Sequence, residues 1–211
     1  MNTEPISQAE LDKQNAEYWN EVCGTHLARN TKTEGNYKAF DAEYFKKYPF
    51  LTSYLDKFSG KVLEIGTGYG TVAQYLHDRC NYLGMDIAQG PLNVLNERGI
   101  RCRLGNVLDM YFDANSFDGV VSIGVLHHTG DISKALEEIH RILKPGGRAL
   151  IMLYNDEAGK LAVDRNTKGE RAPHIEYTNV KDLEALFYYW ASYDWHTENG
   201  QSKDIYIEAI K

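Results

Sequence analysis

From Gly60 onward, short apolar segments alternate with stretches in which apolar residues recur at helical spacing. Short apolar segments of this length predict strands, and the stretches between them predict helices. The segment Gly119–Ile123 is nearly all apolar or small, which is typical of a strand buried on both faces of a parallel sheet. The five predicted strands are Lys61–Ile65, Tyr82–Met85, Arg101–Leu104, Gly119–Ile123 and Arg148–Tyr154.

The clearest helix is predicted over Ile132–Leu143, where apolar residues form one face at helical spacing. Asp131 is placed to cap its first turn, and Lys144–Gly147 ends it with a Pro-Gly-Gly sequence. The apolar face consists of Ile132, Ala135, Leu136, Ile139, Ile142 and Leu143.

The C-terminal part departs from simple alternation of strand and helix. A predicted helix over Thr178–Tyr189 leads into two predicted strands, Ala191–His196 and Asp204–Ile210, with the turn dipeptide Asn199-Gly200 between them. Such a hairpin adds an antiparallel strand to the sheet. We therefore expect an α/β fold with a doubly wound, Rossmann-like sheet of seven mostly parallel strands and a C-terminal antiparallel hairpin.

Residues 1–59 predict an N-terminal helical cap that belongs to the same domain as the core, residues 60–211. Ser7 and Glu10 form a capping box that opens a helix through about Trp19. A loop is predicted around Cys23-Gly24-Thr25, followed by a second helical stretch over Phe40–Lys57. Within the core, the polar segment 155–177 is too long for a simple connection, so we interpret it as an insertion on the substrate side.

Composition narrows the classes of partner. Lys and Arg number 23 against 30 Asp and Glu, a net charge of −7, so we expect no nucleic-acid partner. The first residues lack the pattern of a secretory signal, and no apolar run is long enough for a membrane span. The three cysteines cannot all pair, and none lies in a Cys-x-x-Cys motif. We expect a cytoplasmic protein without a membrane partner, and the sequence predicts no oligomeric state.

A glycine-rich turn follows the first predicted strand, in the arrangement Glu64-x-Gly66-x-Gly68-x-Gly70. Glycines let the backbone turn sharply and let a ligand approach it closely. The dinucleotide fingerprint G-x-G-x-x-G places its third glycine one residue later, where this chain has Thr71. No lysine follows the glycines, as a P-loop requires. The glycine spacing therefore disfavours a nicotinamide oxidoreductase, and the missing lysine disfavours a P-loop nucleotide-binding protein.

Asp86 ends the second predicted strand, 16 residues after Gly70. A carboxylate at this place can accept hydrogen bonds from both hydroxyls of a ribose. The alternative is that Asp86 only caps the helix that follows.

With these segments the chain resembles the class I S-adenosylmethionine-dependent methyltransferases, most closely the type-11 small-molecule group. The resemblance covers about residues 60–154, and its motifs occur in the family's order. They are the glycine turn with Glu64, Gly84-Met85-Asp86, Gly105-Asn106-Val107 with Ser116-Phe117-Asp118, and Leu143-Lys144-Pro145-Gly146-Gly147. The terminal antiparallel strands agree with the same family.

The resemblance implies S-adenosylmethionine as cofactor, with S-adenosylhomocysteine as product. The turn Gly66-Thr67-Gly68-Tyr69-Gly70 would hold the methionine portion, and Glu64 would lie near its ammonium group. Asp86 would bind the ribose diol. The remaining expected cofactor contacts are Ile87 on the adenine face, Asn106 and Val107 at the adenine edge, and Ile123 at the methionine end.

The segment Ser122–Thr129 faces the transferred methyl group in this family. It lacks the Asn/Asp-Pro-Pro-aromatic sequence of enzymes that methylate base amines, and it contains no cysteine. His127 and His128 are the candidate catalytic bases, because histidine titrates near neutral pH. The alternative is that each histidine only hydrogen-bonds to backbone. We expect no metal, since adjacent side chains diverge and a third ligand is not evident.

Candidate acceptor-binding residues lie outside the predicted sheet. Trp19, His26 and Tyr37 belong to the N-terminal cap, and Arg165 and His174 belong to the polar insertion. The alternative for each is a solvated position without a ligand.

The leading hypothesis is an enzyme that methylates an O, N or C atom of a small-molecule acceptor. The alternatives are a methyltransferase acting on RNA or protein, and a non-catalytic partner subunit that keeps the fold.

Overall fold

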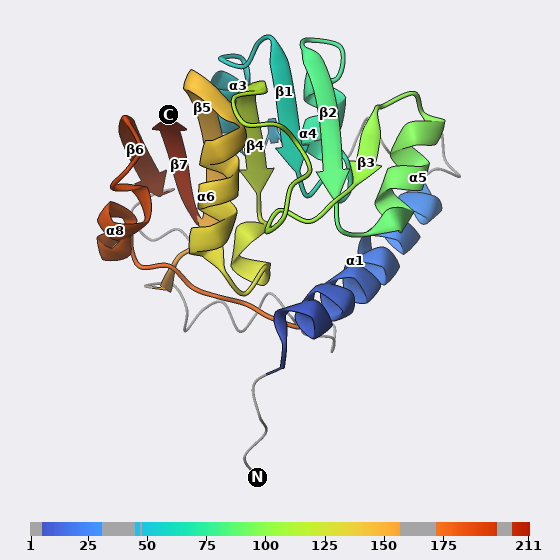
Figure 1. The fold of residues 1–211 in the computed structure, drawn as a ribbon. Helices are drawn as coiled ribbons and strands as arrows, with labels where there is room; N and C mark the ends of the chain where they lie inside the picture. The colour runs from blue at the N-terminus through green and yellow to red at the C-terminus, as the bar shows by residue number, and fades with distance from the viewer. Residues whose placement is uncertain (1–5, 31–44, 47, 157–171, 198–203) are drawn as a thin grey trace.

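The strands of the computed structural model form one seven-stranded sheet (Figure 1). Residues 6–30, 45–46, 48–156, 172–197 and 204–211 are described, with the backbone alone for residues 24–30. The strands are β1 (Lys61–Ile65), β2 (Asn81–Asp86), β3 (Cys102–Leu104), β4 (Phe117–Ile123), β5 (Leu143–Tyr154), β6 (Ser192–Thr197) and β7 (Asp204–Ile210). Their order is β3-β2-β1-β4-β5-β7-β6, and β7 runs antiparallel to both of its neighbours. The predicted fold class is confirmed.

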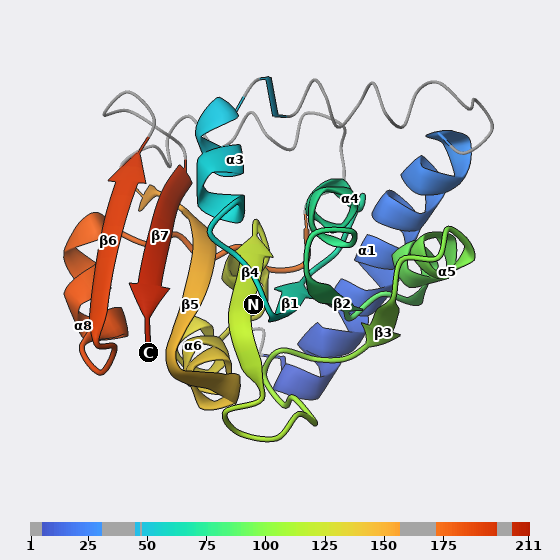
Figure 2. The same ribbon diagram turned by 90° about the horizontal axis from the view of Figure 1, so that it is seen from above.

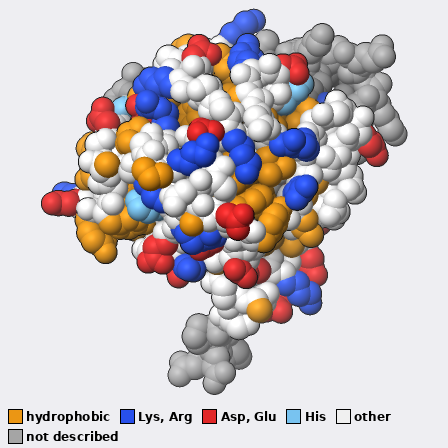
Figure 3. All heavy atoms as spheres, turned by 45° about the horizontal axis from the view of Figure 1, so that its top comes forward, with side chains coloured by type: hydrophobic (Ala, Val, Ile, Leu, Met, Phe, Trp, Pro, Cys, Tyr) orange, Lys and Arg blue, Asp and Glu red, His pale blue; other side chains and the backbone are white. Residues whose placement is uncertain are grey.

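Helices cover both faces of this sheet, as Figure 2 shows. One apolar cluster joins α6 and α8 to the sheet, and a second joins α3, α4 and α5 to the opposite face. The helices are α1 (Gln8–Asn30), α3 (Pro49–Leu55), α4 (Thr71–Leu76), α5 (Gln89–Glu97), α6 (Ile132–Ile142) and α8 (Leu183–Phe187), with short 3-10 turns at Leu126–His128 and Val180–Asp182. In the space-filling view of Figure 3, which brings the top of Figure 1 forward, charged side chains of both signs lie among apolar ones.

Helix α6 agrees with its prediction. All six residues of the predicted apolar face are buried, and the Asp131 side chain accepts a hydrogen bond from the Lys134 backbone N–H at 2.8 Å. Strand β5 starts at Leu143, earlier than the predicted Arg148, because Leu143 already pairs with Phe117 of β4.

The N-terminal segment differs from its prediction. Helix α1 continues through the predicted loop at Cys23-Gly24-Thr25 and ends at Asn30. A glycine inside a helix costs only about 1 kcal/mol, and the buried Cys23 side chain gives this part of the helix a packed face. Helix α3 belongs to the core: Leu51 and Leu55 are buried in the second apolar cluster. Among the described residues of the predicted cap, α3 therefore belongs to a helix layer on the sheet, and α1 lies outside the two layers.

The C-terminal helix is shorter than predicted. Thr178 forms a β-bridge with Asn155, so the chain is still extended there. Helical turns begin only after Asn179, whose side chain accepts a hydrogen bond from the Lys181 N–H at 2.9 Å. The predicted hairpin dipeptide Asn199-Gly200 lies outside the described residues, whereas the antiparallel pairing of β6 with β7 is confirmed.

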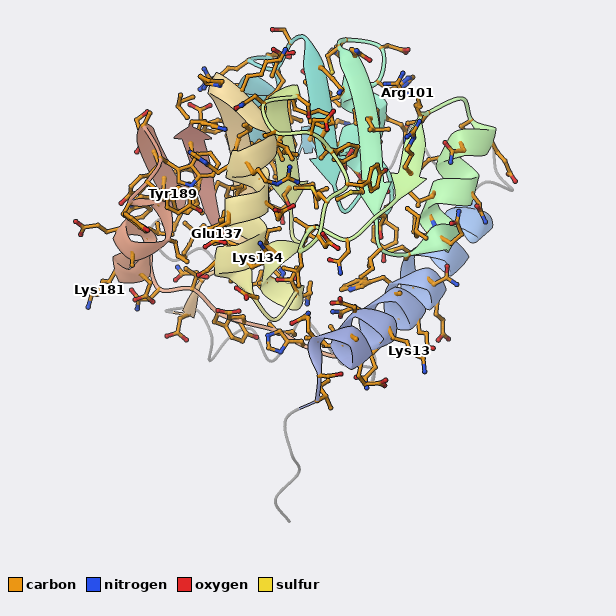
Figure 4. The ribbon with its side chains drawn as sticks, viewed as in Figure 1. Lys13, Arg101, Lys134, Glu137, Lys181 and Tyr189 are labelled. Atoms are coloured by element: carbon orange, nitrogen blue, oxygen red, sulfur yellow. The ribbon has the colours of Figure 1, made fainter. Side chains whose placement is uncertain are left out.

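Ile139→Ala should lower the free energy of unfolding by about 2–5 kcal/mol, because Ile139 is fully buried between α6 and the sheet and its loss leaves a cavity. Urea denaturation measures the change. Glu137→Ala, on the face of α6 turned away from the sheet, is the matched control and should stay within about 0.5 kcal/mol (Figure 4). Equal losses in the two variants would contradict the packing of α6.

Candidate active site

A cavity of about 320 Å³ lies at the carboxyl ends of the central strands, beside α1. Figure 1 shows α1 passing across these strand ends. In open α/β sheets, ligands bind in this position. Its walls come from α1, the glycine turn, the segments after β2, β3 and β4, and the last residue of β5. The lining residues used below are Asp12, Asn15, Trp19, Cys23, Glu64, Gly66, Thr67, Gly68, Asp86, Ile87, Asn106, Val107, Ile123, Val125, His128, Thr129 and Tyr154.

The glycine turn has a backbone that other residues rarely adopt. Gly66 and Gly68 have φ values of +75° and +44°. A Cβ atom on Gly66 would lie 2.2 Å from Cγ2 of Val125, so the position also lacks space for a side chain. The Gly66 N–H donates to the Met85 carbonyl oxygen at 2.7 Å, which fixes the turn against the end of β2. The result is a backbone cradle on the cavity wall.

Asp86 connects the end of β2 to this cradle. Its carboxylate accepts hydrogen bonds from the Gly68 N–H at 3.0 Å and the Ala88 N–H at 2.9 Å. The Thr67 hydroxyl donates to it at 3.4 Å. Burial raises the pKa of Asp86 above its ordinary value, although these hydrogen bonds act in the opposite direction. Asp86 thus accepts from the N–H of Ala88, the residue that precedes α5, but its side chain makes no N-cap hydrogen bond to that helix. Its carboxylate also lines the cavity.

Glu64 is a second buried carboxyl group on the cavity wall. Burial raises its pKa to about 8, a shift that the hydrogen bond from Tyr82 opposes and the nearby Asp86 reinforces. The Tyr82 hydroxyl donates to Glu64 Oε2 at 2.5 Å. Among the described residues, no Lys or Arg lines the cavity. A cationic ligand is therefore the natural partner for this group.

Helix α1 is attached to both sides of the cavity by side-chain hydrogen bonds. The Asn15 amide donates to the His128 carbonyl oxygen and the Gln8 amide to the Thr129 carbonyl oxygen, both at 2.8 Å. Further along α1, the Asn20 side chain joins the helix to α5: its Oδ1 accepts from the Gly90 N–H at 2.6 Å. Sequence reasoning missed Asn15 and Asp12. The signal was present as four residues at helical spacing, Asp12, Asn15, Trp19 and Cys23, but two of them are polar, so they do not form an apolar face.

His128 lines the cavity and is held in one tautomer. Its Nδ1 lies 2.7 Å from the His174 carbonyl oxygen, which can only accept, so Nδ1 carries the proton. Burial lowers the pKa of His128 to about 4, and the ring is therefore neutral near pH 7. Nε2 is left with a lone pair. The His128 ring lies close to the rings of Trp19 and Tyr154, with centroid distances of 4.9 and 5.9 Å.

The adjacent His127 has a different position. Its side chain is fully buried, it does not line the cavity, and its ring stacks on Tyr154 at a centroid distance of 3.5 Å. Of the two candidate bases, the structure places only His128 at the cavity. His127 instead packs against the ring of Tyr154, which lines the cavity.

Of the predicted cofactor residues, all except Gly70 line the cavity. Gly70 adopts φ +77° at the start of α4, where it turns the chain into the helix. Among the predicted acceptor residues, Trp19 lines the cavity and His174 contributes its carbonyl oxygen to His128. Tyr37, Arg165 and the side chain of His26 lie outside the described residues. No group of three potential metal ligands occurs in the part of the chain that the structure describes.

Comparison with known proteins agrees with this geometry. Residues 63–151 match the family model described as a methyltransferase domain. A tRNA (carboxymethyluridine(34)-5-O)-methyltransferase from Arabidopsis thaliana is 30% identical over 123 residues, 56% of this chain and 30% of the relative. Demethylmenaquinone methyltransferase from Symbiobacterium thermophilum is 27% identical over 163 residues, 71% of this chain and 62% of the relative. An S-adenosylmethionine-dependent methyltransferase structure from Mesorhizobium loti shares the fold, with a TM-score of 0.62 and 17% identity over 78% of this chain and 97% of that chain.

The matched domain, residues 63–151, is that of methyltransferases that use S-adenosylmethionine as cofactor. The fold of the chain is that of class I, S-adenosylmethionine-dependent methyltransferase structures. The chain spans 30% and 62% of the length of the two curated relatives. One relative is named for tRNA and the other for demethylmenaquinone, so the comparisons leave both acceptor classes open. None of the helices that the structure describes has the length and apolarity to span a membrane.

The cavity suits S-adenosylmethionine by its chemistry. At Gly68 a Cβ atom would have only Cys23 Sγ and the Gly66 carbonyl oxygen within 4 Å, at 3.9 and 4.0 Å, so the backbone of the turn is open there to a ligand. The buried carboxyl groups of Glu64 and Asp86 complement an ammonium group and a ribose diol, both of which this cofactor carries. Apolar side chains on the wall, such as Ile87 and Val107, suit the faces of a purine.

Gly66→Ala should lower the free energy of unfolding more than Gly146→Ala does. Both glycines have φ +75°, so both substitutions carry the left-handed backbone cost of about 1–2 kcal/mol. Only the methyl group at position 66 meets Val125, whereas nothing lies within 4 Å at position 146. Overpacking adds about 1–3 kcal/mol at Gly66. Urea denaturation of both variants measures the difference, and equal losses would contradict the described turn.

Proposed function

We propose that the protein transfers a methyl group from S-adenosylmethionine to an O, N or C atom of a small-molecule acceptor. The observation that carries the proposal is a neutral His128, oriented by the His174 carbonyl at the same cavity as the glycine cradle and the two buried carboxyl groups. The net charge of −7 supports a small acceptor, because nucleic-acid binding draws most of its affinity from neutralised phosphates.

Glu64 and Asp86 would hold the ammonium group and the ribose of S-adenosylmethionine, whose positively charged sulfur would supply the methyl group and leave as a neutral thioether. The two carboxylates lie at the ends of neighbouring strands, so they fix both parts relative to one rigid sheet. Helix α1 covers the cavity and excludes water. Positioning and exclusion of water supply much of the acceleration in such a displacement.

His128 acts when the acceptor has to lose a proton. A phenol or an alcohol must do so, and Nε2 of the neutral ring is the acceptor for that proton. The imidazolium that forms keeps its Nδ1–H bond to the His174 carbonyl oxygen, which stabilises the charge. An amine or a carbon acceptor can react without this step.

The aromatic surroundings of His128 support a flat, partly apolar acceptor. Trp19 from α1 and Tyr154 from the end of β5 line the cavity, and both rings lie close to the His128 ring. Tyr154 is itself supported by the His127 ring. Rigid aromatic walls bind planar molecules with little loss of side-chain freedom. Trp19 is therefore the acceptor-binding residue that we favour among the described ones.

The proposal is tested by incubating the protein with methyl-labelled S-adenosylmethionine and two acceptor sets, a panel of small phenols, alcohols and amines, and bulk tRNA. Label in a small-molecule product supports the proposed acceptor class. Label in tRNA alone would overturn the proposal of a small-molecule acceptor. It would favour methylation of tRNA, the reaction for which the Arabidopsis relative is named.

Binding of S-adenosylhomocysteine should release a proton through Glu64. The pKa of Glu64 is about 8 in the free protein, so its carboxyl is mostly protonated at neutral pH. A ligand ammonium stabilises the carboxylate, and affinity should therefore rise with pH up to about 8, by at most about tenfold per pH unit. Calorimetry in buffers of different ionisation enthalpy measures the released proton.

Glu64→Gln is the matched control for this experiment, since it keeps the shape and removes the titrating group. The variant should bind more weakly and should show the same heat in every buffer. Buffer-independent heats for the unsubstituted protein would contradict the assignment of Glu64 to the ammonium group.

His128→Gln should lower kcat by about 100-fold for an acceptor that loses a proton, with the affinity for S-adenosylhomocysteine unchanged. In the unsubstituted protein kcat should stay level as pH falls from neutral and decline only near the pKa of about 4 of His128, since protonation there removes the base. His77→Gln, at the end of α4 and outside the cavity, is the control. Full activity of His128→Gln would make the role of His128 structural.

A further inference from the structure

The polar groups along the carboxyl edge of the sheet follow the order of the strands. Asn106 lies just after β3, Asp86 ends β2, Glu64 lies in β1, and His128 follows β4. These four strands are neighbours in that order. The inference below rests on the proposed function, in which Asp86 takes the ribose and Glu64 the ammonium group. With those two ends placed, the nucleobase lies on the β3 side, next to Asn106.

Both polar atoms of the Asn106 side chain already have protein partners. Its Oδ1 accepts from the Leu108 N–H at 2.9 Å, which closes a local turn. Its Nδ2 donates to Asp12 Oδ2 at 2.7 Å. The bond to Asp12 spans 94 positions of sequence and holds the first helix at this end of the cavity. Asn106 thus lines the cavity wall and also holds the carboxylate of Asp12 at the β3 side of the cavity.

Asp12 retains capacity to accept further hydrogen bonds. A carboxylate has about four lone-pair sites, and its described partners are Asn106 and the Gln8 amide, which donates to Oδ1 at 2.8 Å. No ion pair involves Asp12 in the described part of the chain. Asp12 lines the cavity, whereas the next residue, Lys13, points away from the sheet (Figure 4). A neutral N–H donor of a ligand at this end would therefore meet a charged acceptor.

We propose that Asp12 accepts a hydrogen bond from the exocyclic amine of adenine and selects this base. The selecting group then comes from α1, while the sheet supplies the groups for the ribose and the methionine end. Adenine carries an amine donor at its 6-position, and a charged acceptor gives a stronger hydrogen bond to it than an amide oxygen does. Removal of the donor from the ligand and removal of the charge from Asp12 should have the same effect.

The test compares two ligands by calorimetry, S-adenosylhomocysteine and its analogue in which hydrogen replaces the 6-amino group. The unsubstituted protein should bind the analogue about tenfold or more weakly. Asp12→Asn keeps an oxygen for the Asn106 amide but lacks the charge, so it should bind S-adenosylhomocysteine about tenfold more weakly and the analogue as before. Glu17→Gln removes the same charge from an exposed position of α1 and should change neither affinity.

The outcomes separate this inference from the function on which it rests. Binding of neither ligand by the unsubstituted protein would overturn the proposed function, and the inference with it. Equal affinity of the unsubstituted protein for the two ligands would overturn the role of Asp12 and leave the proposed function standing. An equal loss for both ligands in Asp12→Asn would also overturn it, because Asp12 would then act only by holding α1 in place.

Discussion

The carboxylate of Asp86 holds together the parts from which the site is built. It joins the glycine turn after β1 to the segment after β2 through backbone N–H groups of Gly68 and Ala88. Burial disfavours the charged form of Asp86, and these donors are what a buried carboxylate requires. These hydrogen bonds hold the turn in which Gly66 and Gly68 adopt φ angles of +75° and +44°. The cavity wall at this point is therefore built from backbone that one buried side chain keeps in place.

Helix α1 completes the cavity and connects its two ends. Asp12 meets Asn106 on the β3 side, and Asn15 meets the His128 backbone on the β4 side. The proposed adenine contact and the proposed base are thus held by neighbouring turns of one helix. A cofactor that fixes α1 would by the same contacts fix the histidine that faces the acceptor.

The sequence was most informative where burial shapes the pattern of residues. The apolar face of α6 was predicted correctly because its buried residues recur at helical spacing. The bounds of β1 and β7 were predicted correctly because most residues of these strands are buried. The continuous α1 was predicted wrongly, since Gly24 suggests a break and two of the four side chains that face the cavity are polar. The tautomer of His128 depends on a carbonyl 46 positions away, and the Asp12–Asn106 bond on a span of 94. Hydrogen bonds between residues so far apart in the sequence cannot be predicted from local composition or residue spacing.

We expect this cavity to take a sulfonium cofactor with an adenosine moiety and not a nicotinamide dinucleotide, the other ligand class that a glycine turn in such a sheet suggests. Calorimetric titration of the 211-residue chain with S-adenosylhomocysteine and, separately, with NADH distinguishes the two. The expected result is saturable binding of S-adenosylhomocysteine and no binding of NADH. Saturable binding of NADH without any heat from S-adenosylhomocysteine would contradict it.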